Sequence, residues 1–187
     1  MLLCSALLMA SASCASIRIS GGPGIREDAD GIAVKEAIRQ ARASIAGGDY
    51  NKALGIYSRT YNKYPYNVKL MSSYSEAGEQ IRNGADSAYK NASFAEAGHL
   101  YNLLFKNDIT SMDFAPSLSF NSDYLRAQMQ ACSKTLTEIG LTKYREEKLD
   151  EAILMWKQVL TFDPENRGVR KAINTANKQL RIMNSFL

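Results

Sequence analysis

The stretch Ile139–Asn166 reads IGLTKYREEKLDEAILMWKQVLTFDPEN and has the pattern of two helices joined by a charged turn. In the second of these helices, Ala152 and Trp156 share one face, because residues four positions apart lie above one another in an α-helix. Pro164 ends that helix, since proline lacks a backbone donor and its ring clashes with the preceding turn. Gly140 and Ala152 are small enough to let the two helices approach closely. The stretch therefore predicts a closely packed helical hairpin.

An equivalent pattern occurs earlier, in the stretch Ala41–Asn67, which ends GDYNKALGIYSRTYNKYPYN. Ala53 takes the place of the small residue at the crossing, Tyr57 that of the aromatic residue, and Pro65 that of the terminal proline. An asparagine follows each proline after one intervening residue. A second hairpin of the same design is therefore predicted near the start of the chain.

A third and degenerate copy lies between these two, in NASFAEAGHLYNLLFKND, residues 91–108. It keeps Ala97 and Tyr101, but Ile109 stands where the proline would fall. The crossing alanines are 44 and 55 residues apart (97 − 53 and 152 − 97), whereas known two-helix repeats recur every ~34 residues. We assign the extra length to long helices from Asn67 to about Tyr89 and from Asp123 to Glu147, with an ordered loop between Asn107 and Ser122.

The three hairpins resemble the tetratricopeptide-repeat family, whose unit has small residues at the crossing, an aromatic residue beside them and a terminal proline. The resemblance implies an all-α domain of about three antiparallel hairpins, the middle one degenerate. A C-terminal helix is expected to cap the last hairpin, with an apolar stripe of Val169, Ile173, Ala176, Leu180 and Met183. The resemblance assigns repeat packing to Ala53, Tyr57, Pro65, Ala97, Tyr101, Gly140, Ala152, Trp156 and Pro164.

Residues 1–13 carry no charge and are rich in Leu and Ala, but their apolar run is far shorter than the ~20 residues that span a bilayer. This composition is typical of a secretion signal. The small residues from Ala10 to Ser13, followed by Cys14, resemble the bacterial lipobox, which implies that Cys14 becomes a lipid-modified first residue. Two alternatives stay open: ordinary cleavage after Ala12 or Ala15, and an incidental buried thiol at Cys14.

Residues 14–31 contain a Gly-Gly-Pro-Gly run, mixed charges and no helical period, and so predict a flexible tether. The helical domain is expected to span residues 32–187. The lipobox resemblance, with Ala15 rather than Asp after the cysteine, implies an outer-membrane location facing the periplasm. Ordinary cleavage would instead release the protein into the periplasm.

Composition and spacing argue against several functional classes. The net charge of +4 is spread along the chain, so we expect no nucleic acid partner, although the basic C-terminal region suits an acidic partner or anionic lipid. His99 is the only histidine, and neither it nor the cysteines have metal-ligand spacing. Cys132 is interpreted as a buried helix residue. We therefore expect no enzyme activity, no cofactor and no metal.

The positions that the family uses for ligand binding predict a groove on the first helix of each hairpin, rich in the Arg and Tyr side chains that dominate binding hot spots. We therefore expect a membrane-tethered adaptor that binds another protein or a peptide segment and supports assembly of a cell-envelope complex. The alternatives are a solute-binding accessory component of an envelope transport system and, less supported, an envelope hydrolase. The predicted groove residues are Arg39, Arg42, Arg82, Asn83, Tyr89, Lys134, Tyr144 and Arg145.

Overall fold

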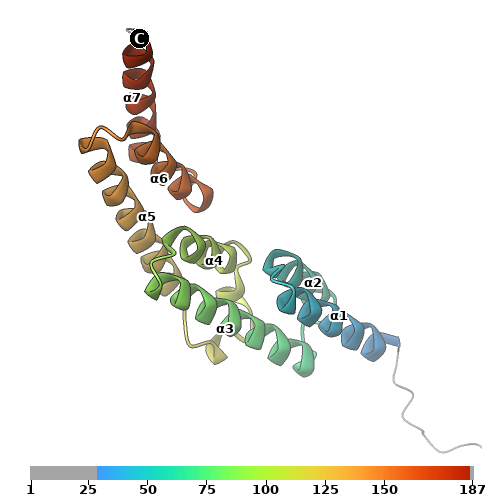
Figure 1. The fold of residues 1–187 in the computed structure, drawn as a ribbon. Coiled ribbons are helices and arrows are strands. Elements are labelled where there is room, and N and C mark those ends of the chain that lie inside the picture. Colours follow the sequence, from blue (N-terminus) through green and yellow to red (C-terminus); the bar gives the residue numbers. More distant parts are fainter. Residues whose placement is uncertain (1–28, 186–187) are drawn as a thin grey trace, which may run out of the picture.

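The computed structural model describes residues 29–185, which form α-helices and two short 3-10 helices without any strand (Figure 1). The all-α prediction is confirmed for this part of the chain. The predicted signal, Cys14 and most of the predicted tether lie outside the described residues. The α-helices are α1 (Ala29–Ala46), α2 (Tyr50–Lys63), α3 (Val68–Lys90), α4 (Phe94–Lys106), α5 (Ser122–Arg145), α6 (Leu149–Phe162) and α7 (Arg167–Asn184).

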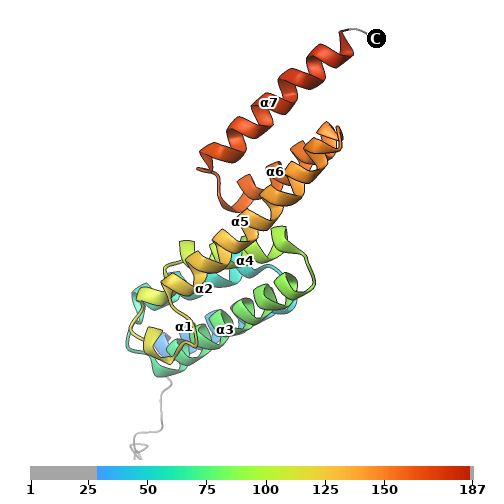
Figure 2. The same cartoon turned by 90° about the vertical axis from the view of Figure 1, so that its left-hand side faces the viewer.

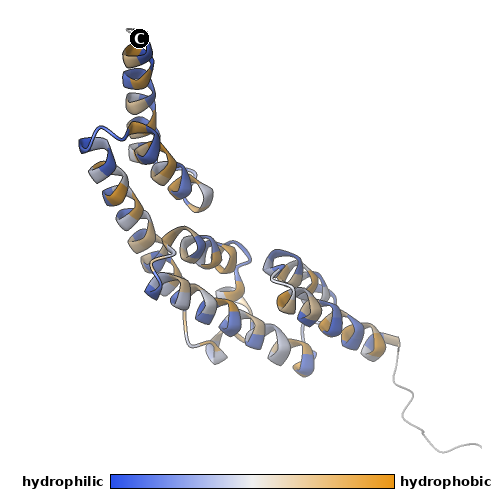
Figure 3. Cartoon of the chain, viewed as in Figure 1, coloured by the Kyte–Doolittle hydropathy of each residue, from blue (hydrophilic) through white to orange (hydrophobic). Residues whose placement is uncertain are grey.

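Consecutive helices pack on one another as the pairs α1 with α2, α3 with α4, and α5 with α6, and α4 also packs extensively on α5. The last helix, α7, packs on α6. Figures 1 and 2 show that the pairs follow one another along an elongated molecule, with α1 at one end and α7 at the other. Each helix carries both apolar and polar residues (Figure 3), as expected when one stripe packs inward and the other meets solvent.

The turns inside the three pairs have the same geometry. Each has one residue in the left-handed region at its centre: Gly48 with φ 77°, Ala92 with φ 60° and Glu147 with φ 62°. Each also closes with the same backbone hydrogen bond, in which the N–H of the turn's last residue donates to a carbonyl five residues earlier, at 2.8, 2.8 and 2.9 Å. The degenerate middle pair therefore shares its turn with the other two, although only the first has glycine there.

The connections after α2 and after α6 also match. Asn67 accepts a hydrogen bond from the Leu70 N–H at 3.0 Å, and Asn166 accepts one from the Val169 N–H at 3.0 Å. Such side-chain caps satisfy donors that the first turn of a helix leaves free. The prolines that precede both caps thus stop one helix, and the asparagines start the next.

The residues assigned to the helix crossings lie in the core. The alanines at the crossings, Ala53, Ala97 and Ala152, are fully buried, and so are the neighbouring rings of Tyr57, Tyr101 and Trp156. Gly140 contacts the Trp156 ring so closely that a Cβ atom would overlap it. The Trp156 Nε1 also donates a hydrogen bond to the Thr137 carbonyl at 3.2 Å. These side chains therefore lie in the core, whereas Pro65 is half-buried and Pro164 is exposed.

The two long helices and the loop between α4 and α5 occur where the sequence predicts them. The loop contains the 3-10 helices Ile109–Ser111 and Ala115–Ser117 and packs against the first two pairs. Its Phe114 ring lies 5.8 Å from that of Tyr61 and 5.1 Å from that of Tyr74. The Tyr61 hydroxyl donates to Asp113 at 2.9 Å. The loop between α4 and α5 therefore packs against α2 and α3 instead of extending into solvent.

The two ends of the domain differ in part from the prediction. The first helix, α1, begins at Ala29, inside the predicted tether. Asp30, in the first turn of α1, accepts a hydrogen bond from the Tyr64 hydroxyl at 2.8 Å. In α7, the first half of the predicted stripe is buried, but Met183 is 46% exposed. The reason is length, since α7 has 18 residues and α6 only 14. The cap therefore covers the last hairpin as far as Leu180, and only its last turn extends beyond the hairpin.

The left-handed turn residue of the middle pair gives a stability test. Ala92→Gly should raise the free energy of unfolding by roughly 0.5 kcal/mol or more, because a Cβ atom is strained in this region and the gain exceeds the entropy cost of glycine. Ala43 is exposed within α1, and there the same change should lower stability by about 1 kcal/mol. Urea unfolding of both variants measures the sign of each change in the free energy of unfolding. A loss of stability in Ala92→Gly would contradict the turn geometry.

Candidate binding groove

The predicted groove residues lie on three helices. Arg39 and Arg42 are on α1, Arg82, Asn83 and Tyr89 on α3, and Lys134, Tyr144 and Arg145 on α5. Arg39 pairs with Glu36 of its own helix at 2.6 Å. Arg42 reaches across to α3 and pairs with Glu76 at 3.0 Å, and both partners of that pair are largely exposed. The two arginines are therefore on the surface and already have carboxylate partners.

Arg82 is held in a network of ion pairs, and its side chain is only 19% exposed. Its guanidinium pairs with Asp86 at 2.6 Å and with Glu79 at 2.9 Å, and it donates to the Ser119 hydroxyl at 3.1 Å. Glu79 in turn accepts hydrogen bonds from the backbone N–H and the hydroxyl of Ser119. This network fixes the loop before α5 to α3.

Asp86 lies at the centre of the same network and joins three helices. One carboxylate oxygen accepts hydrogen bonds from the hydroxyls of Tyr101 at 2.6 Å and Tyr124 at 2.7 Å. Burial by itself raises the pKa of Asp86, but these hydrogen bonds and the one from Arg82 outweigh it, so the pKa lies below its ordinary value. The pKa of Tyr101 is raised, first by burial and then by its bond to this carboxylate.

The remaining predicted residues lie apart from one another. Tyr89 packs edge-on against Phe94 with ring centroids 5.2 Å apart. Tyr144 packs on Trp156 and donates a hydrogen bond to Gln179 of α7 at 2.8 Å. Asn83, Lys134 and Arg145 are exposed. Of the eight predicted residues, only Lys134 lines the main groove described next, and a binding role for the others stays a prediction.

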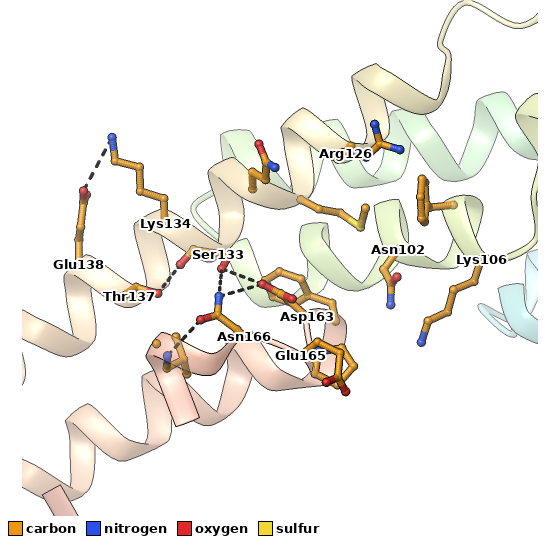
Figure 4. A pocket seen from close by; sticks show the side chains of 17 residues that line it. Asn102, Lys106, Arg126, Ser133, Lys134, Thr137, Glu138, Asp163, Glu165 and Asn166 are labelled. Carbon is orange, nitrogen blue, oxygen red and sulfur yellow. Dashed lines mark hydrogen bonds and ion pairs between the residues drawn. The ribbon is translucent and has the colours of Figure 1, made fainter. Parts of the chain in front are cut away.

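A groove of about 680 Å³ lies between α4, α5 and the turn that leads from α6 into α7 (Figure 4). Within the groove, the guanidinium of Arg126 lies over the ring of Phe105, 5.6 Å from the ring centroid, in a cation–π contact. Polar and charged residues surround an apolar floor. The floor residues are Phe105, Met129, Phe162, Pro164 and Val169.

One stripe of α4 builds the first wall of the groove. Gly98, Asn102 and Lys106 are spaced by four residues, so they share a face of the helix. Gly98 lies against the Phe162 ring, and a Cβ atom there would be only 2.7 Å from the ring carbons. The contact brings the end of α6 next to α4, while Asn102 and Lys106 border the open groove beyond it.

The opposite wall is a small hydrogen-bonded cluster. The Asn166 amide donates to Asp163 at 2.8 Å and to the Ser133 hydroxyl at 3.2 Å. Its oxygen accepts from the Val169 N–H at the start of α7. Sequence reasoning recognised Asn166 only as part of the repeat. Asn102 was also missed, although a lone amide among the apolar residues of HLYNLLFK was a usable signal.

The reactive residue types lie elsewhere or are inert. Cys132 is a free thiol and fully buried, and burial raises its pKa to about 11. The interpretation of Cys132 as a buried helix residue is confirmed. His99 is exposed on α4. Within residues 29–185, no group of three His, Cys, Asp or Glu side chains is arranged to hold a metal ion.

The Asp86 network gives a prediction for acid stability. Because the pKa of Asp86 is lowered in the folded protein, its stabilising effect is present above the ordinary carboxyl pKa and is lost as the pH falls through the folded pKa. Asp86→Asn should cost about 2 kcal/mol near neutral pH, and this difference should shrink towards pH ~3 as the wild-type carboxylate is protonated. Urea unfolding at several pH values tests this, and a cost that does not vary with pH would refute it.

The Gly98 contact predicts a loss of stability. Gly98→Ala should destabilise the fold by about 1–2 kcal/mol, because the overlap with Phe162 outweighs the better helix propensity of alanine. Gly84 is the matched control, since a Cβ atom there would lie at an ordinary 3.8 Å from Leu100. Gly84→Ala should therefore stabilise the protein by up to about 1 kcal/mol. Thermal unfolding compares the two, and equal shifts would show that the Gly98 contact is not tight.

Neither a protein-family model nor a curated protein matches this chain.

Proposed function

We propose that this chain is a non-catalytic, tetratricopeptide-like adaptor that binds another protein and is tethered to a membrane through a lipid on Cys14. The observation that carries the proposal is the open groove, which has an apolar floor and polar walls and lies across three helical elements. In this proposal the protein supports assembly of a cell-envelope complex. Its role is to hold a partner in position rather than to change it chemically.

The equivalent turns support the assignment to a tetratricopeptide-like repeat. The three helix pairs share one turn geometry, have buried alanines at their crossings and have large aromatic residues beside these alanines. The connections after α2 and α6 share a proline followed by an asparagine cap. Stacked hairpins of this kind present extended surfaces that suit polypeptide ligands.

The shape of the groove favours a polypeptide over a small solute. A small ligand is usually enclosed over most of its surface by a preformed pocket. The groove described here is open and is lined by residues from α4, α5 and the turn before α7. Solute binding for envelope transport therefore stays the second candidate, with less support.

The tether and the groove support each other in this proposal. None of the helices described, from Ala29 to Asn184, is both long and apolar enough to span a bilayer. In this proposal the lipobox-like residues that end at Cys14 provide the attachment to the membrane. An anchor on the membrane that also holds the partner raises the effective concentration of the groove, so even a weak contact becomes useful. We propose the outer membrane, facing the periplasm, as the location.

Affinity capture of the tagged full-length protein from its native membrane tests both parts of the proposal. Gln130 is exposed and lines the groove, so Gln130→Trp should fill the groove without disturbing the core. Gln80 is exposed on α3 outside the groove, so Gln80→Trp is a matched control. Wild type and Gln80→Trp should retain a defined envelope protein that Gln130→Trp loses. Mass spectrometry identifies the retained protein.

The Cys14→Ala variant tests the anchor in the same experiment. It should move from the membrane to the soluble fraction, while its purified form still captures the partner from detergent extracts. Unchanged fractionation of Cys14→Ala would reject the anchor. Absence of any retained protein would reject the adaptor, and retention by Gln130→Trp would place the binding surface elsewhere.

A further inference from the structure

The groove is lined by a largely buried asparagine whose amide has no partner within the described chain. Asn102 is only 7% exposed, and its side chain forms no hydrogen bond with any residue of the described chain. Its amide atoms are not completely enclosed, unlike the unpaired buried atoms Tyr57 Oη, Tyr74 Oη and Arg82 Nε, so water or a ligand in the groove can pair with them. Because Asn102 lines the groove, a ligand that enters the groove can reach its amide.

Lys106 provides the second unpaired group, one helical turn further along α4. Figure 4 shows that both side chains leave α4 in the same direction, towards the side of the groove where Glu165 lies. Lys106 is exposed and forms no ion pair within residues 29–185.

The other charged groups of the groove have partners within the chain. Arg126 pairs with Asp123 at 3.2 Å, and Glu165 pairs with Arg170 at 3.3 Å. Lys134 and Glu138 lie 4.0 Å apart, and Asp163 accepts from Asn166. The partners of Asp163 are neutral, so it keeps an uncompensated negative charge on the opposite wall, and Lys106 is the groove cation that has no carboxylate partner within residues 29–185. Lys106 favours a ligand with a negative group beside the end of α4.

We propose that the groove binds an extended, acidic segment of a partner protein, with Asn102 hydrogen-bonded to a backbone peptide group and Lys106 paired with a carboxylate side chain. An apolar side chain of the same segment packs on the floor formed by Phe105 and Met129. This proposal rests on the protein-binding function proposed above and names the chemistry of the partner.

The amide of Asn102 selects an extended segment rather than a helix. A side-chain amide has one acceptor and a donor side by side, so it can pair with both the N–H and the C=O of one residue. Within a helix the N–H and C=O groups of each residue already pair with other residues of the same helix, whereas an extended segment leaves them free to bind a side chain.

The spacing of the two groups fits an extended segment that runs along α4. Four residues of α-helix rise about 6 Å, and two residues of extended chain span about 6.7 Å. The carboxylate that meets Lys106 should therefore belong to a residue about two positions from the one that pairs with Asn102.

Selection from a library of unconstrained linear peptides, displayed without a free C-terminal carboxylate, tests the proposal with the purified full chain. The enriched peptides should share an acidic residue near an apolar one. Synthetic versions of them, followed by fluorescence anisotropy, should bind Asn102→Ala about tenfold more weakly than wild type. Lys106→Ala should bind a few-fold more weakly at low salt and about equally at high salt.

Two matched controls separate the site from general effects on the surface. Asn62→Ala removes an exposed amide on α2, and Lys90→Ala removes the last residue of α3, just as Lys106 is the last residue of α4. Neither control should change binding.

Methylation of single peptide nitrogens in the selected peptide tests the backbone contact without any change to the protein. One position should weaken binding to wild type about tenfold and have little further effect on Asn102→Ala. The effect of methylation on binding to the wild-type protein remains informative even if Asn102→Ala is less stable, because that measurement does not use the variant.

Failure of this proposal can be told apart from failure of the adaptor function. If no peptide is enriched, or if binding is insensitive to Asn102 and Lys106, the extended-segment proposal is overturned. The adaptor function would still stand if capture from the native membrane retains a partner that Gln130→Trp loses. If that capture also fails, both proposals are rejected.

Discussion

The contact between Gly98 of α4 and the ring of Phe162 in α6 determines the shape of the binding region. No side chain larger than hydrogen fits between them, so the two helices meet at this point without a spacer. The turn after Phe162 is thereby placed beside α4, and the groove lies where α4 continues past the contact towards Lys106. A larger residue at Gly98 would move one wall of the groove relative to the other.

The same kind of close approach recurs along the chain and explains why the pairs form one stack. Gly140 admits the Trp156 ring between α5 and α6, and Gly78 meets Ile109 of the inserted loop. The rings of Tyr61, Tyr74 and Phe114 then fill the space between the first pair and the second. Each pair of helices leaves an apolar face that only its neighbour can cover, so the insertions and the cap belong to one continuous core.

Much of the fold could be predicted from the sequence because its signals are local. Helical periodicity, asparagine caps such as Asn67 and the proline stops are read within one or two turns of helix. The groove could not be predicted in this way, because it depends on a contact between Gly98 and Phe162, which are far apart in the chain. The predicted groove positions assumed that the first helix of each pair lines one common hollow, yet Arg82 is held by carboxylates and Tyr144 packs against α7.

Site-specific photo-crosslinking in living cells tests the central claim, that a partner polypeptide occupies the groove. Lys134 lines the groove on α5, whereas Lys157 is exposed on α6 and does not line it. Each is replaced in turn by a photoreactive phenylalanine analogue in the full-length protein. The account predicts a covalent adduct with one other protein from position 134 and none from position 157. Adducts from both positions alike, or from 157 alone, would contradict it.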